Sequence, residues 1–340
     1  MIKSIELNNF RIFDNLKLET NNGLVIISGK NARGKTSIIE AIYIAGTTKS
    51  HRENDLKNVI KFDKPFSKIE INDSKKYKVV ISNDKKSFFI NNAEIKKSNE
   101  YFGNLDCVMI SPLDISLIRG SKLDKRRFLD LNISMLDKKY LNESSKYKKA
   151  LSERNLLLKE KNIDDKLLDV YTNELIESLE YIYKVRISFI DKINGYLKEV
   201  AQNMNIENIR IEYEASYDAH DIKKSFNDKR SSDIKYQSTQ IGVHRDSFKI
   251  YINDLDASVY ASEGQSRIIY ISIKLALVEL MKRVKCEPVL LLDDIYQALD
   301  KDRIISLTRY LDKIKQVFIT TTSILEIPDE ILKRALVLRI

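Results

Sequence analysis

The amino-acid sequence predicts an α/β protein whose main domain is built from both ends of the chain around an inserted helical subdomain. Strand-like apolar runs alternate with helical patterns at both ends of the 340-residue chain. In residues 123–205 glycine almost vanishes, charges dominate and apolar residues fall at helical spacing. A glycine-bearing loop at residues 29–36 stands between an early strand and a helix.

Residues 1–120 form the first part of the predicted main domain. Short alternating runs predict strands near the start of the chain and, farther on, antiparallel hairpins separated by Asn-Asp and Asn-Asn turns. The expected segments are early strands at residues 2–7, 16–18 and 24–27, a helix from Thr36, and a meander at residues 66–95.

Residues 121–205 form the predicted helical insert. A helical run at residues 140–161 is expected to fold back, through a turn at residues 162–165, against a longer helix with an apolar stripe from Leu168. Two interpretations stay open. The insert is either a helical bundle with no function of its own or an arm that projects from the main domain.

Residues 206–340 are predicted to complete the main domain. Strand patterns return here, and strands then alternate with helices in the manner of an α/β core. The expected segments are strands at residues 208–216 and 247–254, a helix at 264–285, the apolar run 289–294, a helix at 301–313 and the strand-like run 317–322.

Composition narrows the class of protein. The formal charge of +9 and the pI of about 9.1 favour polyanionic partners such as nucleic acid, although a lysine-rich composition alone would give the same balance. Cys107 and Cys286 have no partners at metal-ligand spacing and indicate buried thiols in a reducing compartment. Nowhere do eighteen apolar residues run together. We therefore expect a cytoplasmic protein with no membrane contact.

The loop Gly29–Thr36 fits the phosphate-binding pattern GxxxxGK[ST]. Its glycines let backbone N–H groups approach phosphate, Lys35 reaches the β and γ phosphates of ATP, and Thr36 is a ligand for Mg²⁺. Chance is a poor explanation, because the chain has only nine glycines and this loop stands between a strand and a helix. The predicted nucleotide-binding residues are Gly29, Lys30, Asn31, Ala32, Arg33, Gly34, Lys35, Thr36 and Ser37.

Two acids follow the apolar run at residues 289–292. A buried parallel strand here would deliver Asp293 and Asp294 beside the phosphate loop. Asp293 is then expected to hold Mg²⁺ through water, and Asp294 to polarise the water that attacks ATP. Taken alone, the same pattern also fits a strand that ends in an N-capped turn.

A third motif, ASEGQSR, precedes a long amphipathic helix. Ser262, Gly264 and Gln265 at a helix N-terminus form an anion nest, which in ABC-type ATPases contacts the γ-phosphate bound on the opposite subunit. A plain Ser N-cap explains the segment equally well. The order of phosphate loop, SxGQ, two acids and then Asp300, the expected D-loop residue, favours an ATPase that dimerises on ATP.

Several segments carry a wider likeness: LNNFRIFDNLKL, GKNARGKTSIIEAIYI, TTKSHREND, VMISPLDISLIRGSKLDKRRFLD, QIGVHRDS, EGQSR and LLLDDIYQALDKDR. Through them the chain resembles the RecF family of SMC/ABC-type ATPases along nearly its whole length. The resemblance implies an ATP-dependent homodimer that binds double-stranded or gapped DNA and hydrolyses ATP slowly in response to DNA. It also implies partners RecO and RecR, assistance to RecA loading, and a role in repair, replication restart and the SOS response.

The sequence departs from the family pattern in the closing motif. Gln297 and Ala298 replace a Ser-Glu pair, so that Asp294, with Lys35, becomes the expected catalytic residue. The resemblance places Thr320 near the position where transporter ATPases carry a histidine, which implies slow hydrolysis. The alternative function, an SMC-like structural chromosome ATPase, calls for hundreds of residues of coiled coil, and the insert is far shorter.

Cations gather on the early part of the insert. They are expected to neutralise DNA phosphates without reading bases, although a solvated basic face, or pairing with Asp124 or Asp130, would explain them too. The candidate DNA-binding residues are Arg126, Arg127, Lys138 and Lys139. His244 and Arg245 stay unassigned, because they face nucleotide, DNA or only Asp246. Few aromatic residues lie among the cations, which favours duplex over single-stranded DNA.

Overall fold

The computed structural model describes residues 1–20, 23–204, 206, 208–285 and 287–340, and the chain divides into two compact units. The first unit comprises Met1–Ile115, Glu199–Ile206 and Ser262–Ile340; the second comprises Ser116–Lys198 and Glu207–Ala261. Cys107 is buried, as expected, whereas the prediction for Cys286 lies outside the described residues.

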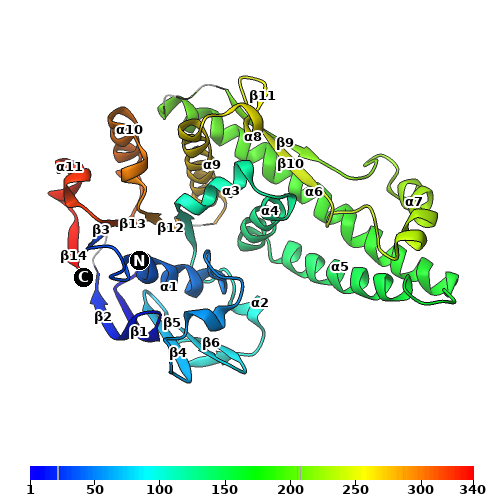
Figure 1. Cartoon of the computed structure of the whole chain (residues 1–340), viewed down its shortest axis with the longest axis horizontal. Helices are drawn as coiled ribbons and strands as arrows, with labels where there is room; N and C mark the ends of the chain where they lie inside the picture. Colours follow the sequence, from blue (N-terminus) through cyan, green and yellow to red (C-terminus); the bar gives the residue numbers. More distant parts are fainter. Residues whose placement is uncertain (21–22, 205, 207, 286) are drawn as a thin grey trace. The chain divides into compact units, whose positions relative to one another are not determined.

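The first unit contains a five-stranded parallel sheet with the strand order β14-β3-β13-β12-β8 (Figure 1). Its three central strands are almost entirely buried, which explains their unbroken apolar runs. The strands are β3 (Gly23–Ser28), β8 (Cys107–Ile110), β12 (Val289–Asp293), β13 (Gln316–Thr321) and β14 (Leu336–Arg339). The long helices of this unit are α1 (Lys35–Thr47), α9 (Glu263–Val284) and α10 (Lys301–Leu311).

An antiparallel sheet of six strands, ordered β2-β1-β4-β5-β6-β7, completes the first unit and confirms the meander and the strands predicted at residues 2–7 and 16–18. The strand predicted at residues 24–27 is β3 of the parallel sheet. Helix α1 contacts strands of both sheets, so nearly all of its side chains are buried. The strands are β1 (Ser4–Phe10), β2 (Phe13–Glu19), β4 (Phe66–Asn72), β5 (Lys76–Ser82), β6 (Lys86–Ile90) and β7 (Ala93–Ile95). Short helical elements are η1 (Leu56–Val59), α2 (Ser98–Tyr101), η2 (Pro112–Ile115), η3 (Tyr296–Ala298), η4 (Ile324–Glu326) and α11 (Asp329–Leu332).

The second unit confirms the helical insert and adds a small antiparallel sheet of three strands, ordered β11-β10-β9 (Figure 1). Its helices are α3 (Ser116–Arg119), α4 (Lys122–Leu136), α5 (Lys138–Leu157), α6 (Asp165–Asn203), α7 (Ile222–Tyr236) and α8 (Ala257–Tyr260). Its strands are β9 (Ile209–Glu214), β10 (Ser247–Ile252) and β11 (Leu255–Asp256). The last residues of α6 belong to the first unit.

The predicted boundaries, 1–120, 121–205 and 206–340, differ from the two units at three places: residues 116–120 and 207–261 belong with the helical insert, and the end of α6 from Glu199 belongs with the main domain. Strand β9 pairs with β10 in register, and neither strand joins the sheets of the first unit. The side chain of Asn194 on α6 bonds both the N–H and the carbonyl of Ile211, each at 2.8 Å. A strand pattern identifies a strand but not its partner, so the sequence pattern placed this segment in the main domain.

No described helix is both long enough and apolar enough to cross a membrane.

Candidate active site

The phosphate loop joins β3 to α1 through a tight turn. Ala32 and Gly34 have φ angles of 62° and 93°, in the left-handed region that favours glycine. A Cβ on Gly34 would lie 2.4 Å from Cζ of Phe13, in the strand that follows the β1–β2 turn. The motif therefore requires glycine at position 34, because the β1–β2 hairpin packs directly on the loop.

Lys35 stands at the N-terminus of α1 and is buried. Its ammonium group donates to the carbonyl oxygens of Gly29, at 2.8 Å, and Lys30, at 3.0 Å. A cation and a helix N-terminus together form an anion site. Neutral carbonyls are weaker partners for an ammonium group than a phosphate oxygen, so the arrangement holds Lys35 ready for an anion.

The carboxyl ends of β3, β12 and β13 bring the predicted metal ligands together. Asp293 Oδ1 accepts hydrogen bonds from Thr36 Oγ1, at 2.9 Å, and from Thr320 Oγ1, at 2.7 Å. Among the described residues there is no cluster of three or more His, Cys, Asp or Glu side chains that would hold a metal by itself. One hydroxyl and one carboxylate fit Mg²⁺, which binds through few protein oxygens and keeps water and phosphate as its other ligands.

Asp294 differs from its neighbour in its surroundings. Its backbone is left-handed, with φ 53°, and its N–H donates to Thr320 Oγ1 at 3.0 Å. Its Oδ1 atom is buried and has no hydrogen-bond partner within the described chain. Burial and then the charge of Asp293 raise its pKa, against the opposing effect of Lys35. A carboxylate with a raised pKa and an unused oxygen is suited to accept a proton or orient water.

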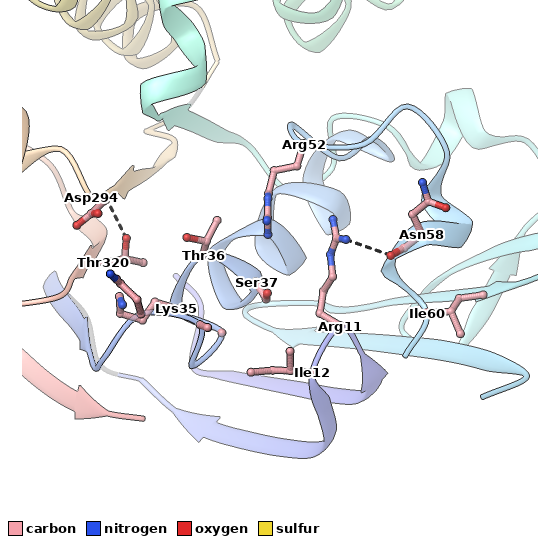
Figure 2. Close-up of a pocket in the computed structure, with 13 residues that line it drawn as sticks. Arg11, Ile12, Lys35, Thr36, Ser37, Arg52, Asn58, Ile60, Asp294 and Thr320 are labelled. Carbon is pink, nitrogen blue, oxygen red and sulfur yellow. Dashed lines mark hydrogen bonds between the residues drawn. The ribbon is translucent and has the colours of Figure 1, made fainter. Parts of the chain in front are cut away.

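A cavity of about 470 Å³ lies over these groups (Figure 2). Eight of its thirteen lining residues had been singled out from sequence: Asn31, Ala32, Gly34, Lys35, Thr36, Ser37, Asp294 and Thr320. The other five were missed: Arg11, Ile12, Arg52, Asn58 and Ile60. Gly29, Lys30, Arg33 and Asp293 do not line it. The missed residues come from the β1–β2 turn and the segment after α1, and Figure 2 shows both arginines reaching toward this space.

The SxGQ segment forms the N-terminus of α9. Ser262 Oγ accepts from the N–H of Gln265, at 3.2 Å, and Gln265 Oε1 accepts from the N–H of Ser262, at 2.9 Å. This reciprocal capping box is the structural alternative that sequence left open. A Cβ on Gly264 would meet no heavy atom within 4 Å, so this turn faces open space. Asp300 likewise caps α10, and its carboxylate pairs with Arg303 at 2.6 Å.

The candidate DNA-binding residues of the second unit differ in how they are held. Arg126 is half-buried and donates to the carbonyl of Asp246 at 2.9 Å. Arg127 is exposed and lies 3.9 Å from a carboxylate oxygen of Asp124. Lys138 is exposed, and the ammonium group of Lys139 lies 4.3 Å from the centre of the Tyr181 ring. Arg127, Lys138 and Lys139 are therefore exposed, whereas Arg126 is not.

His244, which sequence left unassigned, has an internal structural role. Its Nε2 donates to the carbonyl of Thr239 at 3.1 Å, and its Nδ1 therefore accepts from Tyr147 Oη at 2.7 Å. Burial lowers its pKa to about 4. Arg245 is exposed, and its guanidinium makes long contacts of 3.4 Å with the same carbonyl. His244 is thus a neutral imidazole that links two segments of the second unit through its two hydrogen bonds.

Comparison with known proteins identifies the family of this architecture. Residues 1–327 match the family described as RecF/RecN/SMC N terminal domain. The DNA replication and repair protein RecF of Acholeplasma laidlawii is 40% identical over 325 residues, covering 94% of this chain and 93% of that protein. RecF of Clostridium perfringens strain SM101 is 38% identical over 340 residues, with 95% and 93% covered. This chain belongs to the RecF family.

Solved structures agree with the family. The recombination mediator protein RecF-ATP of the RecFOR pathway aligns with a TM-score of 0.89 at 32% identity, over 95% of this chain and 92% of that one. The RecF-ATPrS form aligns with a TM-score of 0.88 at the same 32% identity, over 96% and 94%. An Smc head domain from Pyrococcus furiosus, at 15% identity and a TM-score of 0.53, shares the fold alone. The fold is thus an ABC-type ATPase head with a helical insertion, as the sequence predicted.

Proposed function

We propose that this chain is an ATP-dependent, DNA-binding recombination mediator of bacterial replication and repair. One observation supports the ATP site above all. Lys35, Thr36 and Asp294 line a single cavity, and Asp293 bonds Thr36 directly. Solved relatives described as RecF-ATP and RecF-ATPrS add support for the same ligand.

The chain's own groups suit phosphoryl transfer to water. When nucleotide binds, Lys35 would exchange its two carbonyl partners for phosphate oxygens, and Thr36 and Asp293 would hold Mg²⁺. Bound Mg²⁺ would neutralise charge that develops on the phosphates. Asp294 orients the attacking water with its unpartnered oxygen. Thr320 hydrogen-bonds both the carboxylate of Asp293 and the backbone N–H of Asp294, which holds the two acids in place. Its hydroxyl is not a general base, so Asp294 has no second base beside it at this position. We propose slow hydrolysis that DNA stimulates.

The remaining parts of the proposal concern assembly. Gly264 and the capped turn around it face open space and would receive the γ-phosphate held by a second copy, so that ATP joins two heads. The exposed cations of the second unit then contact duplex or gapped DNA. The RecFOR pathway named for the solved relatives suggests RecO and RecR as partners, with RecA loading as the outcome. A protein with this task acts on chromosomal DNA in the cytoplasm.

The deciding experiment changes Lys35 to Ala. We expect a fluorescent ATP analogue to lose affinity at least 100-fold, because phosphate loses a charge-assisted bond worth about 3 kcal/mol. Gel shifts with duplex, gapped and single-stranded DNA, each with and without ATP, would show ATP-dependent retention of the first two by the parent only. Equal analogue affinity in parent and variant would rule out this loop as the nucleotide site.

A further inference from the structure

Glu40 is a buried carboxylate in the middle of α1, with no exposed surface. Its oxygens accept from two nitrogens of Arg11: from Nε at 2.9 Å and from Nη2 at 2.6 Å. Ser50 Oγ donates to Glu40 at 2.5 Å, and Arg52 Nη1 lies 3.6 Å away. One acid therefore holds the β1–β2 turn and the segment after α1, the two segments that supply the unpredicted wall of the cavity.

The two arginines are held differently. Arg11 uses all three guanidinium nitrogens, because Nη1 also bonds the carbonyl of Asn58 at 3.1 Å and Glu53 at 3.4 Å. Its pKa is raised by Glu40 although burial opposes the shift. Among the described residues, the side chain of Arg52 has only the long contact with Glu40, and it is 40% exposed. A bidentate buried pair is fixed, whereas a half-exposed pair at 3.6 Å is weak and changes partner easily.

The loop that carries Arg52 is also built on Glu40. Ser50 Oγ, which donates to Glu40, accepts from the N–H groups of Arg52 at 2.9 Å and Glu53 at 3.0 Å. This hydroxyl turn sets the backbone from which Arg52 enters the cavity. Loss of the Glu40 carboxylate would release both the turn and the side chain.

We propose that Glu40 is a positioning residue for the polyphosphate of ATP. It keeps Arg11 as a fixed part of the cavity wall and presents Arg52 as a cation that passes from Glu40 to a phosphate oxygen when the nucleotide binds. This inference rests on the proposed function of the cavity.

Removing the charge of Glu40 has two opposing effects on nucleotide affinity, and their relative sizes decide whether binding becomes stronger or weaker. Freeing Arg52 from a competing anion would strengthen phosphate binding, but a half-exposed pair is weak, so this gain in affinity is at most about 5-fold. Losing the bidentate bond to Arg11 and the hydrogen bond from Ser50 would release the two segments that line the cavity, the β1–β2 turn and the segment after α1. Hydrogen bonds to a charged group contribute more, and the loss of one corresponds to about 10-fold or more in affinity. The net result is weaker binding.

The test uses the full chain and a fluorescent ATP analogue. We expect Glu40→Gln to weaken the analogue's affinity about 10-fold or more, by loss of bonds to a charged group. Ser50→Ala, which leaves every charge in place, should give a smaller loss in the same direction. Glu70→Gln is the matched control: Glu70 is a buried carboxylate beside Lys68 and Lys76, at 3.3 and 3.1 Å, and does not line the cavity. It should bind as the parent does.

A double-mutant cycle separates positioning from a general loss of structure. If Glu40 acts through the two arginines, Glu40→Gln should weaken binding much less in a background that carries both Arg11→Gln and Arg52→Gln than in the parent. Equal effects in both backgrounds would overturn the proposal, and so would parent-like affinity of Glu40→Gln and Ser50→Ala. Lys35→Ala identifies the other kind of failure. Full analogue affinity in that variant would refute the proposed nucleotide site itself, whatever Glu40 does.

Discussion

The phosphate loop of the first unit and the His244 loop of the second are both motif-bearing turns, but their polar groups are satisfied differently. Among the described residues, Lys35 at the phosphate loop donates only to carbonyl oxygens, and Asp294 keeps a buried oxygen without a partner. In the second unit, Asp246 accepts from Tyr213 Oη, at 2.5 Å, and from both the N–H and the hydroxyl of Ser216, at 2.8 Å each. Buried polar groups that lack a strong partner within the protein indicate a ligand site. Buried polar groups that are fully hydrogen-bonded within the protein indicate a structural motif.

Arg186 shows the second case most clearly. Its side chain is only 3% exposed and donates to the carbonyl of Val243, to Tyr140 Oη and to Asp130, at 2.8, 2.9 and 2.8 Å. A buried arginine paired in this way holds α4, α5, α6 and the His244 loop to one another. The motif around His244 therefore specifies the packing of the second unit, which explains why sequence found its charged residues but no ligand for them.

The largest effect that would test this contrast is expected for Asp294→Asn. The amide keeps the size of the side chain but cannot accept a proton, and loss of a catalytic base lowers turnover about 10²- to 10⁴-fold. Affinity for ATP should stay near that of the parent, since Lys35, Thr36 and Asp293 remain. Phosphate release and analogue titration would be measured side by side, with exposed Asp302→Asn as control. Turnover at the parent rate would remove Asp294 from the mechanism.

The same substitution also tests whether ATP hydrolysis releases the protein from DNA. If hydrolysis opens the ATP-bound dimer, Asp294→Asn should remain on DNA longer than the parent when ATP is present. Dissociation of labelled duplex DNA after addition of unlabelled competitor measures this lifetime. A variant that no longer hydrolyses ATP but leaves DNA as fast as the parent would separate catalysis from release.

The phosphate loop and the two acids were predictable because their signals are local. Glycines, Lys35 and Thr36 occur in one stretch, and an apolar run that ends in two acids indicates a buried parallel strand. Arg11 and Arg52 occur in segments that carried the family likeness, yet only the fold brings them to one cavity. Glu40 did leave a signal. A lone acid among the apolar residues of α1 predicts a buried partner, although sequence does not say which.

The boundary of the second unit was not predictable in the same way. Residues 207–261 show ordinary strand patterns, and nothing local states that β9 and β10 pair only within their own small sheet. Helix α7 was also missed: it is rich in charge, and among its residues only Phe226 and Asp233 are buried. Arg154 and Asp233, paired at 2.8 Å with almost no exposure, fix that helix through contacts 79 residues apart. The periodicity of apolar residues in a sequence does not reveal long-range pairing of this kind.

A smaller effect is expected from pH, and it belongs to the second unit. The pKa of folded His244 is about 4, below its usual 6.5, so between these values only the unfolded chain binds the proton. Stability should therefore fall as the pH falls from about 7 toward 4, by about 2 kcal/mol at pH 5. The raised pKa of buried Asp246 acts in the opposite sense, and the lowered pKa of His51 in the first unit in the same sense.

The contribution of His244 is isolated by His244→Gln, whose amide can make both hydrogen bonds without titrating. Urea unfolding at pH 7 and pH 5 should show a smaller loss of stability on acidification for this variant than for the parent. His220→Gln, at an exposed position, should behave as the parent does. If His244→Gln lost as much stability as the parent, the imidazole would not be the neutral group that its two hydrogen bonds indicate.

The smallest expected effect separates two neighbouring arginines of α4. Arg127, with its side chain 56% exposed, is available to a DNA phosphate, whereas Arg126 is half-buried on the carbonyl of Asp246. Each phosphate contact contributes about 0.9 to the slope of log affinity against log salt. We therefore expect Arg127→Gln to lower the slope for duplex DNA by about 0.9 without changing the melting temperature. Arg126→Gln should instead lower the melting temperature, because it leaves a carbonyl of the His244 loop without its donor.

Lys96→Gln, at an exposed lysine after β7, controls for the change in net charge. An unchanged slope in Arg127→Gln, with DNA still bound, would place the phosphate contacts on other cations, and Lys138 would be the next to change.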